Sequence, residues 1–155
     1  MIIKIKIAEL ANKIRDTYLA EASSIPEDAS AGRTAGDVTE NEFERAVITA
    51  DTSVREAIFR FLHHSFAFGS NPVLPTDLSL VDDLTYDFCG TARRLAGKQV
   101  ILANHISDAI IHSALCELFG SLNQDLSAKH GAIATESKNN LQSLLYFKHK
   151  PIRHS

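Results

Sequence analysis

Three polar side chains in an otherwise apolar stretch have the spacing best suited to chemistry. His105, Asp108 and His112 follow one another at intervals of three and four positions, so on a helix they share one face. Two imidazoles and a carboxylate are ligands that zinc or iron accepts. Three ligands leave a zinc site incomplete, and a fourth would have to come from elsewhere, for example from His63 or His64.

The same polar line has a plainer interpretation, which we prefer. It faces solvent, a neighbouring subunit or a polar partner across a helical bundle, where a buried histidine hydrogen-bonds a carboxylate or a carbonyl. Cys116 lies four positions after His112 and could in principle form an activated thiol with it. We expect it instead to pack as a small apolar residue on a buried helix. The chain is therefore predicted to have no catalytic residue, no cofactor and no metal.

Sequence motifs of the familiar enzyme classes are missing from the chain. It contains no GxSxG, HExxH, Walker or GxGxxG pattern. Di-iron bundles require Glu-x-x-His pairs, and none of the seven histidines has Glu three positions before it. Asp82, Asp83 and Asp87 lack the residue order of a calcium loop, so we expect solvated acids there. These observations indicate a protein that is not an enzyme.

Length and composition predict a single globular domain. The chain has 155 residues, of which 45% are hydrophobic and 23% charged, and its net charge of −3 argues against a general nucleic-acid binder. No apolar run reaches the length of a membrane span, and the first residues lack the features of a signal peptide. Cys89 and Cys116 have no CxxC spacing, so we expect free thiols in a reducing compartment.

The helix that would carry the polar line is predicted over residues 99–120. This stretch has no Pro, its only Gly is the last residue, and apolar side chains surround most of its girth, which is typical of a buried helix. Apolar residues at spacings of three and four predict further helices over residues 7–22, 40–66 and 123–146. We therefore expect an all-α bundle of about four main helices around a central apolar helix.

Short segments outside the helices complete the predicted domain of residues 1–155. Isoleucine and lysine alternate in an N-terminal arm, residues 1–6, which could pair with residues 84–88 as a minor two-stranded element. Residues 23–37 are rich in small and polar residues and predict a long loop. Residues 147–155 form a basic tail.

The N-terminal arm, two phenylalanines outside the main apolar stripe of the second predicted helix, and the basic tail are predicted to contact other chains. Apolar and basic segments outside a helical core are a means of clasping neighbouring subunits in a larger assembly. The residues that we expect at such interfaces are Ile3, Ile5, Phe66, Phe68, Lys148, Lys150 and Arg153.

The order of the elements resembles small helical proteins of tailed bacteriophages and prophages. The resemblance spans residues 38–155 and is carried by TENEFERAVITADTSVREAIFRFL, then LTYDF, then LAGKQVILANHISDAIIHSALCELFG and a final helix with a trailing tail. In that group, head–tail connector proteins, also called neck or head-completion proteins, form rings beneath the portal. No functional residue is carried over, because such proteins act through interfaces.

The resemblance implies a structural role in a virion. It implies a homo-oligomeric ring with portal or tail proteins as neighbours. From the hydropathy and the net charge we expect no membrane partner and no sequence-specific nucleic-acid contact. The protein would be found in the virion and in the host cytoplasm during assembly, or in the cytoplasm if it is cellular. The competing hypothesis is a helical-bundle metal-binding protein or enzyme that uses His105, Asp108 and His112.

Overall fold

The computed structural model describes residues 1–23, 40–62, 83–88, 97–120 and 122–146. Most of the predicted long loop and the whole predicted basic tail lie outside these residues. So do several residues singled out from the sequence: His63, His64, Phe66, Phe68, Asp82, Cys89, Lys148, Lys150 and Arg153.

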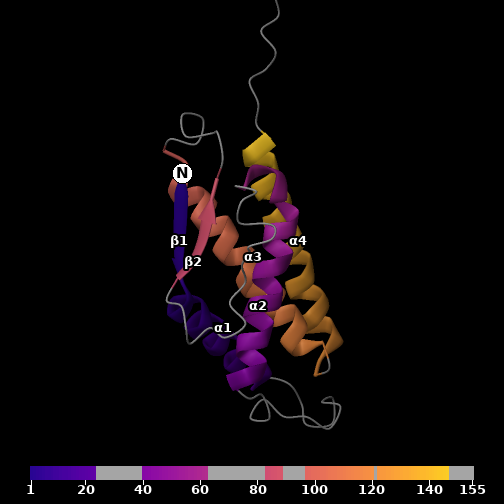
Figure 1. Ribbon diagram of the computed structural model, residues 1–155. Coiled ribbons are helices and arrows are strands. Elements are labelled where there is room, and N and C mark those ends of the chain that lie inside the picture. Colours follow the sequence, from indigo (N-terminus) through magenta and orange to yellow (C-terminus); the bar gives the residue numbers. More distant parts are fainter. Residues whose placement is uncertain (24–39, 63–82, 89–96, 121, 147–155) are drawn as a thin grey trace, which may run out of the picture.

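Four α-helices and a two-stranded sheet make up the described chain (Figure 1). In chain order they are β1 (Ile2–Lys6), α1 (Ile7–Ala22), α2 (Glu40–Ala57), the 3₁₀ turn η3 (Phe59–Phe61), β2 (Asp83–Asp87), α3 (Gln99–Phe119) and α4 (Gln124–Tyr146). The prediction of a mostly helical bundle with a minor strand element is confirmed.

The second helix is shorter than predicted. Its pattern indicated a helix to residue 66, but α2 ends at Ala57. Ile58 leaves the helical conformation with φ −119° and ψ 20°, and η3 follows. Leu62 then forms an isolated bridge with Phe88. The apolar residues after Ala57 therefore keep helical spacing in the sequence, but in the structure they belong to η3 and to the bridge with Phe88.

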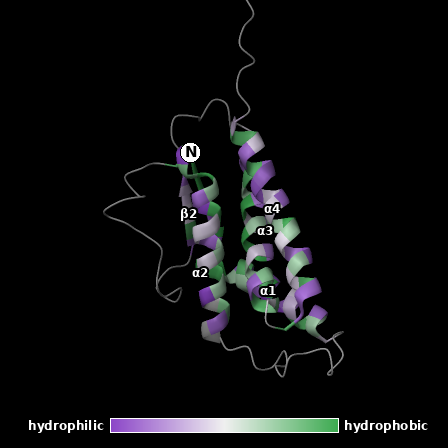
Figure 2. Cartoon of the chain, turned by 90° about the vertical axis from the view of Figure 1, so that its right-hand side faces the viewer, coloured by the Kyte–Doolittle hydropathy of each residue, from purple (hydrophilic) through white to green (hydrophobic). Residues whose placement is uncertain are grey.

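The central position of α3 is confirmed by its contacts. It packs against α1, α2, α4 and β1, and it lies between the sheet and the outer helices in Figure 1. Its fully buried side chains are Leu102, Ile106, Ala109, Ile110, Ala114, Leu115 and Phe119. Burying one large aliphatic side chain contributes about 1.5–3 kcal/mol, so this helix contributes strongly to the stability of the core. Figure 2 shows hydrophobic residues in green along the helices.

The first turn of α3 departs from the prediction of a helix buried around most of its girth. Val100 is 72% exposed and Ile101 is 47% exposed. Burial begins at Leu102, which is fully covered.

The N-terminal arm is part of the chain's own sheet, which corrects the expectation that Ile3 and Ile5 contact a neighbouring chain. Strands β1 and β2 are antiparallel, with Ile3 opposite Tyr86 and Ile5 opposite Leu84. Ile3 and Ile5 are 5% and 7% exposed, because alternate residues of a strand point to one face and here that face covers the helices. The two-stranded pairing is thus confirmed, and these side chains are used within the chain.

Helix α4 lies closely against α3. The side chain of Asn123 accepts a hydrogen bond from the backbone N–H of Leu126 (3.1 Å) and so caps the start of α4. Gly131 permits the close approach, because a Cβ there would lie 3.2 Å from the Sγ atom of Cys116. None of the helices in the described ranges is long and apolar enough to cross a membrane.

Candidate functional site

The three residues predicted as metal-ligand candidates lie on the partly exposed side of α3. His105 and His112 are half-buried and Asp108 is exposed. Within the part of the chain that the structure describes, no three His, Cys, Asp or Glu side chains gather closely enough to hold a metal ion. The structure therefore does not bring His105, Asp108 and His112 together as a metal site.

His112 instead contacts a histidine of α4. Its Nδ1 atom lies 2.8 Å from Nδ1 of His130, and the two ring planes lie within 20° of each other, with centroids 5.1 Å apart. His130 is 1% exposed. Its Nε2 atom lies 2.9 Å from Oε1 of Glu21, near the end of α1. A carboxylate and two imidazoles from three helices thus form one hydrogen-bonded chain, which we call the histidine cluster.

Neighbouring rings hold His130 in place. The Phe119 ring lies nearly parallel to the His130 ring with centroids 5.8 Å apart, and Phe119 stacks on Tyr18 of α1 at 4.9 Å. The Oε2 atom of Glu21 lies 3.6 Å from the Nζ atom of Lys129. The histidine cluster therefore sits where α1, α3 and α4 meet.

The surroundings of His112 lower its pKa from the ordinary value of 6.5. Burial contributes most, because it disfavours the charged imidazolium, and the neighbouring His130 acts in the same direction. Asp108 and Glu21 oppose the shift, and Lys129 adds to it. In this site the neutral form of His112 is favoured near neutral pH.

Cys116, predicted to pack on a buried helix rather than to form an activated thiol with His112, lies against α4. Its Sγ atom is 3.5 Å from Oγ of Ser127, and the same hydroxyl donates to the carbonyl of Cys116 at 2.8 Å. These contacts tie Cys116 to the packing of α4 on α3.

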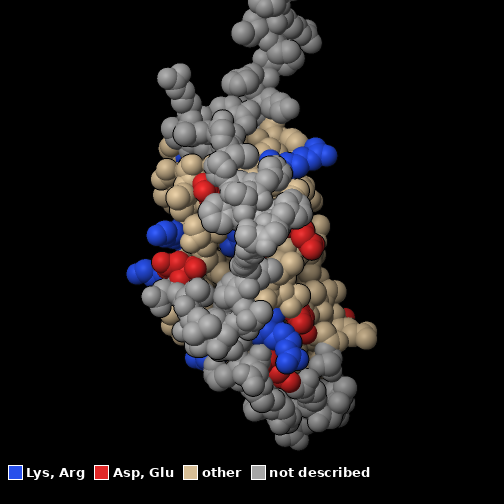
Figure 3. Space-filling view, viewed as in Figure 1, with Lys and Arg blue, Asp and Glu red and all other residues tan. Residues whose placement is uncertain are grey.

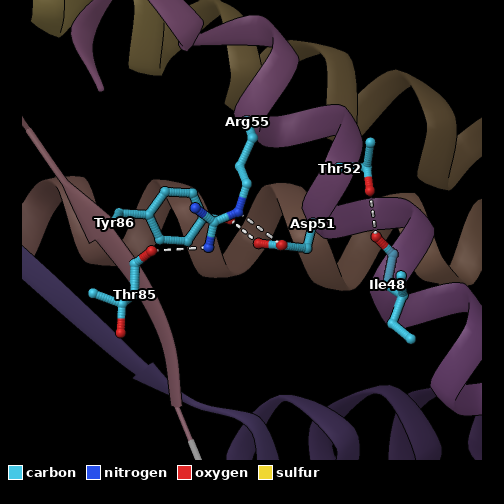
Figure 4. Close-up of polar contacts among 6 residues, drawn as sticks. All are labelled: Ile48, Asp51, Thr52, Arg55, Thr85 and Tyr86. Carbon is cyan, nitrogen blue, oxygen red and sulfur yellow. Dashed lines mark hydrogen bonds and ion pairs between the residues drawn. The ribbon is translucent and has the colours of Figure 1, made fainter. Parts of the chain in front are cut away.

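A second polar cluster, absent from the sequence-based predictions, joins α2 to β2 (Figure 4). Asp51 is 1% exposed and accepts hydrogen bonds from the Tyr86 hydroxyl and from Nε of Arg55, the latter at 2.8 Å. Arg55 also donates from Nη2 to the carbonyl of Thr85 at 2.8 Å. Its guanidinium carbon lies 4.2 Å from the centroid of the Tyr86 ring. We call these four residues the aspartate cluster.

The aspartate cluster makes the stability of the protein sensitive to alkaline pH. Burial, and secondly the charge of Asp51, raise the pKa of Tyr86 well above 10.0. The unfolded chain then releases the tyrosine proton near pH 10 while the folded chain keeps it, so stability falls as pH rises above about 10.

Tyr86→Phe, which removes the titrating hydroxyl, should weaken this alkaline loss. Urea unfolding from pH 8 to 11 checks the prediction. Equal slopes in the wild type and the variant would contradict it.

Large apolar side chains are exposed at one end of the molecule. The N-terminal end of β1, the start of α3 and the end of α4 all lie at the upper end of Figure 1. These segments carry Ile2, Val100, Ile101 and Tyr146, which are 57%, 72%, 47% and 42% exposed. We call these four residues the apolar end.

The charged side chains that the structure describes, unlike the four residues of the apolar end, are not gathered at one end of the molecule. In Figure 3, basic and acidic side chains alternate over the described part of the face in view, and neither sign forms a continuous patch there. The described surface of this face thus lacks the basic stripe that a nucleic-acid interface uses.

Comparison with known proteins gave no relative. No family model, no curated protein and no solved structure matches the chain.

Proposed function

We propose that this chain is a non-enzymatic assembly protein that forms a homo-oligomeric ring. In the setting that its layout resembles, it is a head–tail connector of a tailed bacteriophage, with portal or tail proteins as neighbours in the virion. The order of α2, β2, α3 and α4 agrees with the layout on which the resemblance rests. The main support for the proposal is the apolar end.

The apolar end favours a protein partner because its side chains gain free energy by leaving water. Each square ångström of apolar surface removed from water contributes about 25 cal/mol. Single exposed apolar residues are common on protein surfaces, whereas several at one end of a small domain favour an interaction surface. The first turn of α3, with Val100 and Ile101, is its most exposed part.

The proposal predicts a change in oligomeric state when this turn is made acidic. The paired substitution Val100→Glu and Ile101→Glu places two charges in the proposed interface, where they cannot be buried without a large penalty. We expect the wild-type full chain to form oligomers at micromolar concentration and the paired variant to be monomeric. Native mass spectrometry and light scattering measure the mass, and circular dichroism checks that the helical content is unchanged.

Leu19→Glu is the matched control. Leu19 is an apolar residue on α1 with 48% exposure, and α1 lies at the opposite end of the molecule from the apolar end (Figure 1). We expect this variant to form oligomers as the wild type does. A wild-type chain that stays monomeric at all concentrations, or oligomers unaffected by the paired substitution, would contradict the proposal.

A further inference from the structure

We propose that His112 and His130 form a proton-operated latch that stays closed while the pair holds no more than one extra proton and opens when both rings are cationic. The latch joins α3 to α4 and, through Glu21, to the end of α1. This inference is independent of the proposed assembly role, because the histidine cluster lies at the α1 end of the bundle and shares no residue with the apolar end.

The geometry limits the number of protons that the pair can hold. Two nitrogen atoms 2.8 Å apart form a hydrogen bond only if one carries hydrogen and the other accepts it. When both histidines are neutral, Nδ1–H of His112 donates to the bare Nδ1 of His130. When both are cationic, two N–H groups point at each other in a gap that has room for one hydrogen, and the rings must separate.

His130 can hold one extra proton without losing either of its hydrogen bonds. Its Nε2–H donates to the carboxylate of Glu21 at 2.9 Å, and this bond stays in place when Nδ1 also carries hydrogen. The Nδ1–H of a cationic His130 then donates to His112, which takes the opposite tautomer. The contact survives with its direction reversed, so one proton leaves the latch closed.

The second proton falls on His112, whose surroundings resist it. Burial and a cationic His130 both oppose its charge. The other charged groups that face it are Asp108 on α3 and Glu21 on α1, which favour protonation, and Lys129 on α4, which opposes it. The opposing influences prevail, since the pKa of His112 is lowered.

The sign of the pH effect follows from this shift. Below pH 6.5 the open or unfolded chain binds the second proton more readily than the closed state does, so the closed state loses stability as pH falls. Above pH 6.5 the contribution of the latch is complete. The latch therefore opens on acidification below about pH 6.5.

Opening of the latch should also affect the packing of α1 and α4. His130 contacts the rings of both His112 and Phe119, and Phe119 is stacked on Tyr18 of α1. Helices α1 and α4 otherwise make few contacts with each other in the described chain. Separation of the rings removes support from the Glu21–His130 bond, so the end of α1 should loosen together with α4.

Two measurements on the full chain test the latch. In a histidine NMR titration of the wild type, we expect the midpoint of His112 below pH 6.5. His130→Asn removes one titrating ring, and the midpoint of His112 should rise in that variant. A His112 midpoint at or above 6.5, or one unchanged by His130→Asn, would overturn the proposal.

Hydrogen exchange measures the opening itself. Between pH 7 and pH 5 we expect the protection factors of amides near Glu21 and Phe119 to fall more than twofold in the wild type; one proton taken up on opening limits the fall to about tenfold for each pH unit. In His112→Asn, which cannot titrate, the fall should be less than about twofold. His105→Asn, on the same helix but outside the histidine cluster, should respond as the wild type does. A full loss of protection in His112→Asn would refute the latch.

Discussion

Replacing Asp51 by alanine is expected to lower the free energy of unfolding by about 3 kcal/mol, the lower end of the range for breaking a buried charge pair. The substitution leaves the hydroxyl of the fully buried Tyr86 without its acceptor and the guanidinium of Arg55 without its carboxylate. The lower end applies because the Arg55 side chain is 28% exposed, so water can solvate the guanidinium after the carboxylate is removed. Urea unfolding followed by circular dichroism at pH 7 measures the change.

Two milder variants separate the parts of this effect. Asp51→Asn keeps an oxygen acceptor for Tyr86 and loses only the charge, so it should cost less than Asp51→Ala. Tyr86→Phe removes the hydroxyl and should cost about 1–3 kcal/mol. In the double variant that combines Asp51→Ala with Tyr86→Phe, the losses of unfolding free energy should not add, because both single changes break the same hydrogen bond. Additive losses would show that Asp51 acts mainly through Arg55 and would contradict this account of the aspartate cluster.

The helices of the bundle could be predicted from the sequence because helical periodicity is local information. The predicted helix over residues 7–22 has the same bounds as α1, and the predicted central helix matches α3 to within one residue. The end of α2 could not be found this way. The apolar pattern continues past Ala57, whereas the chain there turns through η3 and Leu62 pairs with Phe88, which lies far away in the chain.

The polar clusters were missed for a related reason. His130 lies four positions after Leu126 and three before Ile133, so it falls on the apolar stripe of α4, and a polar residue in such a stripe signals a buried partner. The sequence contained that signal, but it could not name Glu21 or His112 as the partner. Asp51 likewise follows Val47 by four positions and precedes Val54 by three, and its partner Tyr86 comes from a strand 35 residues away.

Both clusters link elements that are distant in sequence. They differ in the residue types that form them. The aspartate cluster pairs a carboxyl group with a permanent cation and a hydroxyl, and none of its members is a histidine. The histidine cluster contains two imidazoles, the side chain whose ordinary charge change falls between pH 5 and 8. The first is therefore a fixed join between α2 and β2, and the second is the join that a change in pH can release.

Replacing Phe119 by alanine is expected to be the most damaging single change in the core, at about 3–5 kcal/mol of unfolding free energy. The ring is fully buried and stacks on Tyr18 and on His130, so its removal leaves a cavity where three helices meet. Phe119→Leu retains most of the volume and should cost clearly less. Chemical denaturation of both variants at pH 7 gives the two losses.

Val100→Ala is the matched control for this loss. It also shortens an apolar side chain of α3, but at a position that is 72% exposed, so its effect should stay within about 0.5 kcal/mol. The contrast tests whether burial, rather than apolar character, sets the cost along this helix. If Phe119→Ala and Val100→Ala cost similar amounts, the junction of α1, α3 and α4 cannot be packed around Phe119, and the stacking that connects the histidine cluster to α1 fails with it.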